Sequence, residues 1–179
     1  MMVAVALFAV VMVISTGALL SLIDATRKAQ ALQSVMNNLN IALDGMVRSI
    51  RMGSVYHCGN LGTLSDPRDC QNGNTFFAFE SFGGDTSTIS DQWIYNFTTD
   101  SNGVGRIYKS VNGGGTWFAV TTPEVEIEDV NIYVTGTNPG DDNQPKVVIT
   151  MKGTAGAEKA KTRTTFSIQA SATQRLLDI

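Results

Sequence analysis

The sequence predicts an α+β protein in which a long N-terminal helix packs on a C-terminal antiparallel β-sheet domain. Two observations favour this fold class. Up to Met52 the chain contains no proline and places its apolar residues at a helical spacing. After Gly53 it changes to short β-rich runs separated by glycine, asparagine and proline. A length of 179 residues suits one domain with a short extension.

The composition excludes several classes of function. Charged residues make up 16% of the chain, compared with about 25% in an average soluble protein, and the net charge is -3. We therefore expect no nucleic-acid partner, because the chain lacks the excess of Lys and Arg that would form a polybasic surface. His57 and the two cysteines are too few for a zinc site, and a serine triad would have His57 as its only base. We expect a protein that is not an enzyme and holds no cofactor.

Residues 1–23 predict a membrane-spanning segment. They carry no charge, and only Ser15, Thr16 and Ser21 are polar. As a helix these residues extend about 35 Å, enough to cross a hydrocarbon core of about 30 Å. The alternative is a secretory signal peptide, but that requires a basic residue before the apolar run, and the sequence shows none there.

Residues 24–52 continue the same helix as an amphipathic half. Apolar residues at spacings of three and four form one stripe, which we expect to pack on the rest of the chain. The stripe consists of Leu32, Met36, Leu39, Leu43, Met46 and Ile50. One helix from near Met1 to about Met52 would be about 75 Å long, with Gly53 as its stop. In the apolar half, Gly17 either permits close helix contacts or local unwinding, or is incidental.

Residues 53–179 predict a β-rich globular domain. Candidate strands are 75–82, 92–98, 105–111, 116–121, 124–135, 145–152 and 162–173. Asn112 and the three glycines after it predict a hairpin loop, because asparagine and glycine tolerate positive φ. The expected core between sheet and helix consists of Phe76, Phe77, Phe79, Phe82, Trp93, Tyr95, Phe97, Trp117 and Phe118.

The segment Met2–Val11, which reads MVAVALFAVV, resembles the continuation of the prepilin methylation motif. In that motif a short basic leader ends in glycine and is followed by FTLIE, a hydrophobic residue and a run such as MVAVAIF. With the long helix and the β domain, this opening resembles the type IV pilin and type II secretion pseudopilin family. The resemblance is specific over residues 1 to about 52 and only architectural beyond. The ending Ser171–Asp178 is a weaker similarity.

The resemblance implies a structural subunit that assembles through its N-terminal helix into a type IV pilus or a secretion pseudopilus. It implies other pilin-like subunits, the inner-membrane assembly machinery, prepilin peptidase and the lipid bilayer as partners. It also implies a single-pass protein of the bacterial cytoplasmic membrane whose β domain is extracytoplasmic, and then a periplasmic or extracellular filament. We expect a leader glycine and an FTLIE-like segment to precede Met1. The alternative function is a single-span anchored binding domain that does not polymerise.

Cys58 and Cys70 bracket a turn-rich segment and predict a disulfide in an oxidising compartment. Unpaired structural cysteines and a nucleophile formed by Cys58 with His57 are the alternatives. Neighbouring side chains in an extended segment point to opposite faces, which disfavours the nucleophile. Arg27 and Lys28 follow the apolar segment and, taken alone, would place the β domain in the cytoplasm. The implied basic leader would reverse that preference.

An acidic stretch is the one patterned set of charges. Its members are Glu124, Glu126, Glu128, Asp129, Asp141 and Asp142. Strand alternation would place the three glutamates on one face with Val125 and Ile127 behind them. We interpret them as members of cross-strand ion pairs on a solvated face. Steering between filament subunits and calcium binding in the loop of Asp141 and Asp142 are the alternatives.

Overall fold

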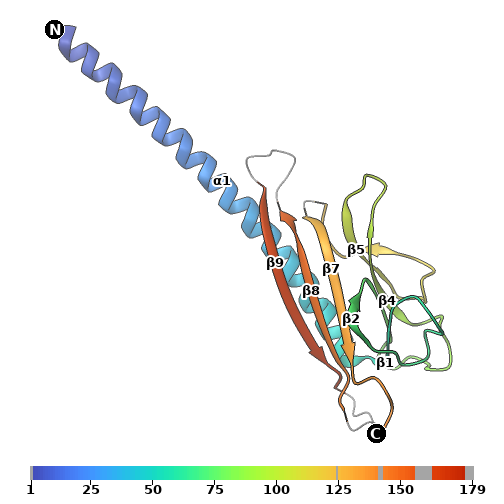
Figure 1. The fold of residues 1–179 in the computed structure, drawn as a ribbon. Coiled ribbons are helices and arrows are strands. Elements are labelled where there is room, and N and C mark those ends of the chain that lie inside the picture. Colours follow the sequence, from blue (N-terminus) through green and yellow to red (C-terminus); the bar gives the residue numbers. More distant parts are fainter. Residues whose placement is uncertain (1, 124, 141–142, 156–162, 176–179) are drawn as a thin grey trace.

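The computed structural model describes residues 2–123, 125–140, 143–155 and 163–175. One helix and two antiparallel sheets make up the described chain, which confirms the α+β class (Figure 1). The helix is α1 (Met2–Met52). The strands are β1 (Ser54–Cys58), β2 (Cys70–Asn74), β3 (Phe76–Glu80), β4 (Trp93–Thr99), β5 (Gly105–Ser110), β6 (Phe118–Ala119), β7 (Val125–Thr135), β8 (Lys146–Ala155) and β9 (Thr164–Thr173).

The second half of α1 supplies one wall of the core. Leu39, Leu43, Met46 and Ile50 are buried as the stripe predicts, and Leu32 and Met36 are partly buried against the same core. Val35 is also buried, although the predicted stripe omits it, because a helix face in contact with a broad sheet is wider than one row of side chains. The helix packs mainly on β9 and β8.

After the helix ends at Met52, the backbone at Gly53 passes close to β3. A Cβ atom at position 53 would collide with the Phe79 ring and would lie 2.8 Å from the Glu80 carbonyl oxygen. Glycine therefore permits a turn that directs β1 back into the sheet. The Tyr56 hydroxyl then donates a 2.5 Å hydrogen bond to the carbonyl oxygen of Ile50, which joins the helix end to β1.

The strands form two sheets instead of the one that the sequence pattern suggests. The five-stranded sheet has the order β1-β3-β4-β5-β6, and the four-stranded sheet has the order β2-β7-β8-β9. Aromatic rings of Phe77, Phe79 and Tyr95 stack on the core side of the first sheet, with centroids 5.5 and 6.0 Å apart along the row. The core lies between α1 and both sheets.

The sequence-based prediction misses two strands, β1 and β2. Both lie where the sequence suggests the helix stop and a turn-rich segment. The sequence pattern does not reveal them, because each is only five residues long and lacks an alternating apolar pattern. β1 contains an irregularity between Ser54 and His57, where the φ of Val55 is 50°. This bulge allows Tyr56 to face the core, while His57 pairs with Ala78 across the strands.

Several predicted core aromatics are exposed. Phe82 is 69% exposed and Phe118 is 57% exposed, while Trp117 is also on the surface. Phe82 lies beyond the end of β3, and Phe118 lies on β6, a two-residue edge strand. Position in the fold therefore decides burial here, not residue type. The predicted hairpin at Asn112 is confirmed, since β5 and β6 pair antiparallel around it.

The acidic part of β7 departs from simple alternation. Val125 and Ile127 are buried as predicted, but a register irregularity between Ile127 and Asp129 exposes Glu128 and Asp129 in succession. The Glu126 carboxylate forms an ion pair with Arg163, which reaches across β8. Glu124, Asp141 and Asp142 lie outside the described residues, so the calcium alternative for that loop lies outside them too.

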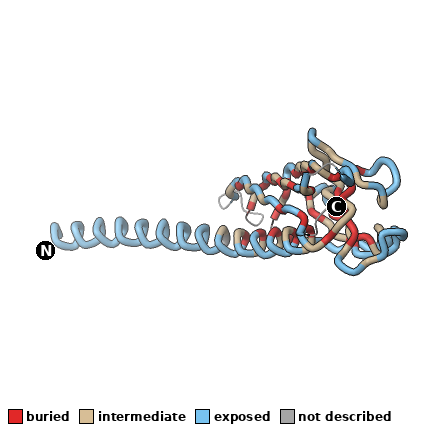
Figure 2. The backbone as a smooth tube through the Cα atoms, turned by 90° about the horizontal axis from the view of Figure 1, so that it is seen from below, coloured by how far each residue is buried: buried red, intermediate tan, exposed pale blue. Residues whose placement is uncertain are grey.

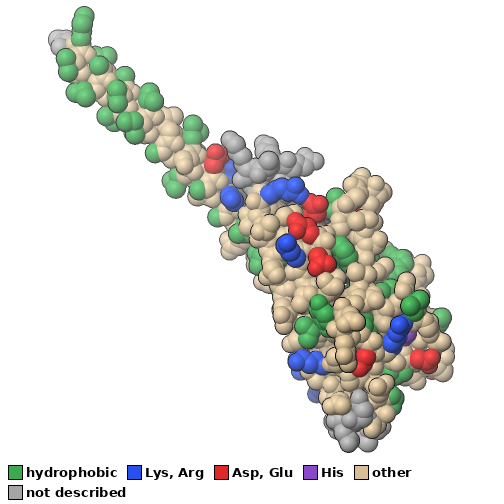
Figure 3. Space-filling model, in the orientation of Figure 1, with side chains coloured by type: hydrophobic (Ala, Val, Ile, Leu, Met, Phe, Trp, Pro, Cys, Tyr) green, Lys and Arg blue, Asp and Glu red, His purple; other side chains and the backbone are tan. Residues whose placement is uncertain are grey.

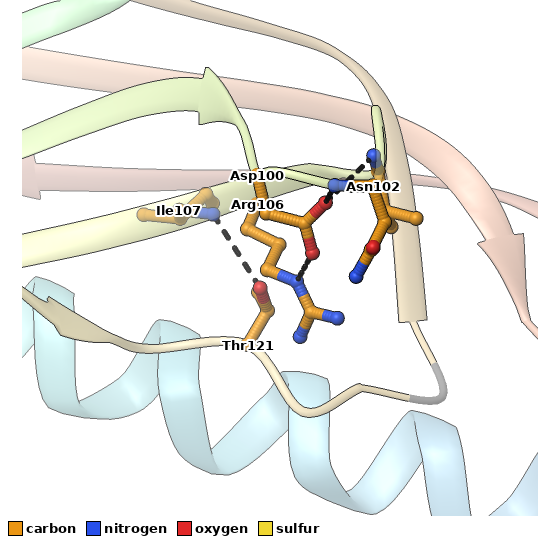
Figure 4. Close-up of polar contacts among 6 residues, drawn as sticks. Asp100, Asn102, Arg106, Ile107 and Thr121 are labelled. Carbon is orange, nitrogen blue, oxygen red and sulfur yellow. Dashed lines mark hydrogen bonds and ion pairs between the residues drawn. The ribbon is translucent and has the colours of Figure 1, made fainter.

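The β4–β5 hairpin contacts the second sheet beside its turn. Figure 4 shows Asp100 accepting hydrogen bonds from Arg106 Nε at 2.8 Å and from the Asn102 backbone N–H at 2.8 Å. Hydrogen bonds from the Val104 backbone and the Arg106 side chain lower the pKa of Asp100. Gly105 follows this turn, and a Cβ atom there would collide with the Ile127 carbonyl oxygen of β7. The turn therefore fixes where the two sheets approach each other.

Cys58 and Cys70 form a disulfide, as predicted, with Cα atoms 5.7 Å apart. Cys58 ends β1 in one sheet and Cys70 begins β2 in the other, so the bond links the two sheets as well as closing a loop. Both sulfur atoms lie near the carbonyl oxygen of Ile132, at 3.6 and 3.2 Å. The disulfide is therefore part of the core boundary.

We expect the double substitution of Cys58 and Cys70 by alanine to lower the free energy of unfolding by about 3 kcal/mol, because the unfolded chain regains the freedom of the closed loop. Urea unfolding with and without a reductant measures this. The double variant serves as the control, since reductant should not change its stability. Full thiol labelling of the native wild-type protein without reductant would contradict the disulfide.

Candidate functional site

The first half of α1 is an apolar helix that no other described part of the chain covers. Every described residue of α1 up to Gln30 is exposed, and the buried positions begin only in the second half (Figure 2). An 18-residue window in α1 has a mean hydropathy of 2.6 and is 0% buried. By length and composition, α1 is the one helix in the described chain that could span a membrane. Figure 3 shows hydrophobic side chains along the projecting helix.

The polar groups of this segment are compatible with an apolar surrounding. The Thr16 hydroxyl donates a 2.8 Å hydrogen bond to the carbonyl oxygen of Met12 one turn earlier, so it needs no external partner. Helical backbone groups are likewise satisfied within the helix, which is the requirement for a segment in lipid. The exposed charges begin at Asp24, followed by Arg27 and Lys28, and they mark the boundary of the apolar half.

The predicted assembly residues separate into two groups in the structure. Leu32, Met36, Leu39, Leu43, Met46 and Ile50 contribute to the core of the domain. Gly17 alone among them lies on the projecting half, and a Cβ atom at this position would have no neighbour within 4 Å. A larger side chain at Gly17 therefore meets no obstacle within the described chain.

His57 is buried in β1, but it lies outside the core cluster to which α1 contributes. Its Nδ1 atom is 2.7 Å from the Asp66 carbonyl oxygen, and its Nε2 atom is 3.1 Å from the Leu61 carbonyl oxygen. The ring therefore holds the loop between the two cysteines against β1. A shallow pocket borders this loop. In the described part of the chain, no three His, Cys, Asp or Glu side chains form a group that could hold a metal ion.

Comparison with known proteins gives no relative. No protein-family model, curated protein or solved structure matches this chain. The fold and the exposed helix define an α+β protein with one long helix that is apolar enough to cross a membrane and a disulfide-linked, two-sheet domain. Its function must therefore be inferred from these physical features.

Proposed function

We propose that this protein is a pilin-like structural subunit that assembles through its N-terminal helix into a type IV pilus or a type II secretion pseudopilus. The observation that carries the proposal is the continuity of α1 from Met2 to Met52. Its second half is part of the domain core, and its first half is apolar and uncovered. The orientation of the apolar half is thus fixed relative to the domain.

A fixed orientation is useful in a symmetric assembly and unnecessary in a simple anchor. In a filament, every subunit must present the same helix surface at the same angle to its neighbours. A flexible linker between span and domain would suffice to tether a monomer to a bilayer. The uncovered helix contacts lipid before assembly and neighbouring helices afterwards, so both environments satisfy its apolar surface. The disulfide is consistent with an extracytoplasmic domain.

Gly17→Leu tests this proposal against the monomeric anchor. Because nothing lies within 4 Å of a Cβ atom at Gly17, the variant is expected to fold and to insert into the membrane at wild-type levels. In a helix bundle the added side chain would obstruct close approach of a neighbouring helix, so we expect recovery in sheared filaments to fall at least severalfold. Membrane fractionation and filament recovery from cells expressing the natural gene measure the two quantities.

Ala18→Leu is the matched control. Ala18 is also exposed on the apolar half, and the substitution adds similar apolar volume at a position about 100° further around the helix. Normal filament recovery in this variant would show that the loss is specific to the Gly17 surface. Wild-type protein that never appears in a filament fraction would instead favour the single-span anchored domain.

A further inference from the structure

The five-stranded sheet has a second buried face, opposite the core, that contains unsatisfied polar groups. A row of paired residues crosses this face, namely His57, Ala78, Ile94 and Ser110, and each is at most 1% exposed. Glu80 lies two positions after Ala78, and Gln92 lies two positions before Ile94. Because side chains alternate along a strand, both lie on the same face as this row. Continuing the register of Phe79 with Trp93 by one residue places Glu80 opposite Gln92.

Glu80 and Gln92 together bury three side-chain oxygen atoms that have no hydrogen-bond partner among the described residues. Glu80 is 1% exposed and Gln92 is 0% exposed. Both carboxylate oxygens of Glu80 and Oε1 of Gln92 lack a hydrogen-bond partner in the described part of the chain. The orientation of the Gln92 amide is fixed, because its Nε2 donates a 3.0 Å hydrogen bond to the Leu64 carbonyl oxygen. Rotating the amide would place two oxygens against each other there.

A second acidic side chain, Asp91, borders the same site. A Cβ atom at Gly84 would collide with Glu80 Oε1 and would lie 3.2 Å from Asp91 Oδ2, so these two oxygens border the same point of the loop. The Asp85 backbone N–H donates to Asp91 Oδ2 at 2.9 Å, and the Thr88 hydroxyl donates to Asp91 Oδ1 at 2.9 Å. The carboxylate of Asp91 is therefore held in place by its own loop.

The electrostatics of the two carboxyl groups favour either a proton on Glu80 or a cation beside it. Burial raises the pKa of Glu80, and the charge of Asp91 raises it further; the nearby Ser81 backbone N–H has a smaller opposing effect, although it does not meet the geometry of a hydrogen bond to the carboxylate. The hydrogen bond from the Asp85 backbone lowers the pKa of Asp91, followed by that from Thr88, so Asp91 stays ionised. A proton on Glu80 would supply one donor, whereas a cation at the point that Glu80 Oε1 and Asp91 Oδ2 border could contact both carboxylates.

We propose that Glu80, Asp91 and Gln92 bind one calcium ion on this second face of the five-stranded sheet. The ligands are carboxylate and amide oxygens only, which hard cations prefer over nitrogen and sulfur sites. No third carboxylate, thiol or imidazole joins them among the described residues, so carbonyl oxygens and water complete the shell. Ca²⁺ accepts such irregular shells, whereas Mg²⁺ demands near-octahedral geometry. The ion would join the end of β3 to the loop that leads into β4.

The test is calcium binding by the full-length protein in detergent micelles. Equilibrium dialysis with radioactive Ca²⁺ should show one ion per chain, with a Kd of about 10⁻⁴ to 10⁻³ M as in extracellular calcium modules. Calcium should also raise the unfolding temperature. Glu80→Gln and Asp91→Asn should each raise the Kd at least about tenfold, because charge count tunes the affinity of such sites. Glu80→Gln keeps the size of the side chain, so it should fold.

Glu128→Gln is the matched control, since Glu128 is an exposed glutamate on β7, in the other sheet. It should bind calcium like the wild type. In calcium-free buffer, Glu80→Gln should be at least as stable as the wild type, since it removes an uncompensated charge. Absence of stoichiometric binding at millimolar calcium, or binding unchanged by Glu80→Gln, would overturn the proposal and assign a proton to Glu80.

Discussion

Removal of residues 1–24 is expected to transfer the protein from the membrane fraction to the soluble fraction while the β domain stays folded. None of the described residues in that segment is buried, so no core contact is lost. Each large apolar side chain that leaves water contributes about 1.5–3 kcal/mol, and a run of such side chains therefore dominates membrane retention. Fractionation, size-exclusion chromatography and circular dichroism of the remaining chain measure the result.

A longer deletion provides the control. Removal of residues 1–40 also takes away Val35 and Leu39, which are 3% and 1% exposed in the core. We expect this variant to lose its cooperative unfolding transition or to aggregate, because the sheet core would be opened to water. Aggregation or loss of the sheet signal after the shorter deletion would contradict the division of α1 into a free half and a packed half.

Ile50→Ala is expected to lower the free energy of unfolding by about 2–5 kcal/mol, the usual cost of truncating a fully buried isoleucine. Ile50 is 0% exposed and lies where the helix end meets β1. The substitution leaves its backbone carbonyl group, so the hydrogen bond from the Tyr56 hydroxyl can persist and the measurement isolates side-chain packing. Urea unfolding of the fragment that begins at residue 25 is the assay.

Ile41→Ala is the matched control on the same helix. Ile41 is 71% exposed, so its truncation should change the free energy of unfolding by no more than about 0.5 kcal/mol. Equal losses in both variants would mean that the helix does not pack on the sheets through the face seen in the structure. A large loss for Ile50→Ala alone would support that packing.

The sequence by itself determined the helix, because helix formation depends on local signals. An uncharged opening, unbroken apolar spacing and Gly53 define α1 within one residue of its predicted end. The hairpin at Asn112 also follows from local turn chemistry. The cysteine pair is a similar case, since two cysteines near each other in the chain have few alternative partners.

Only the tertiary structure decided how the strands divide between two sheets. Strand pairing is non-local, so nothing in the five residues of β1 or β2 specifies that they join different sheets across the Cys58–Cys70 bond. The exposure of Phe82 and the burial of Glu80 have the same cause. Glu80 is the last residue of β3 and is bordered by the loop that follows it, whereas Phe82 lies just beyond the strand and stays on the surface. Burial depends on such contacts, and residue type alone cannot encode them.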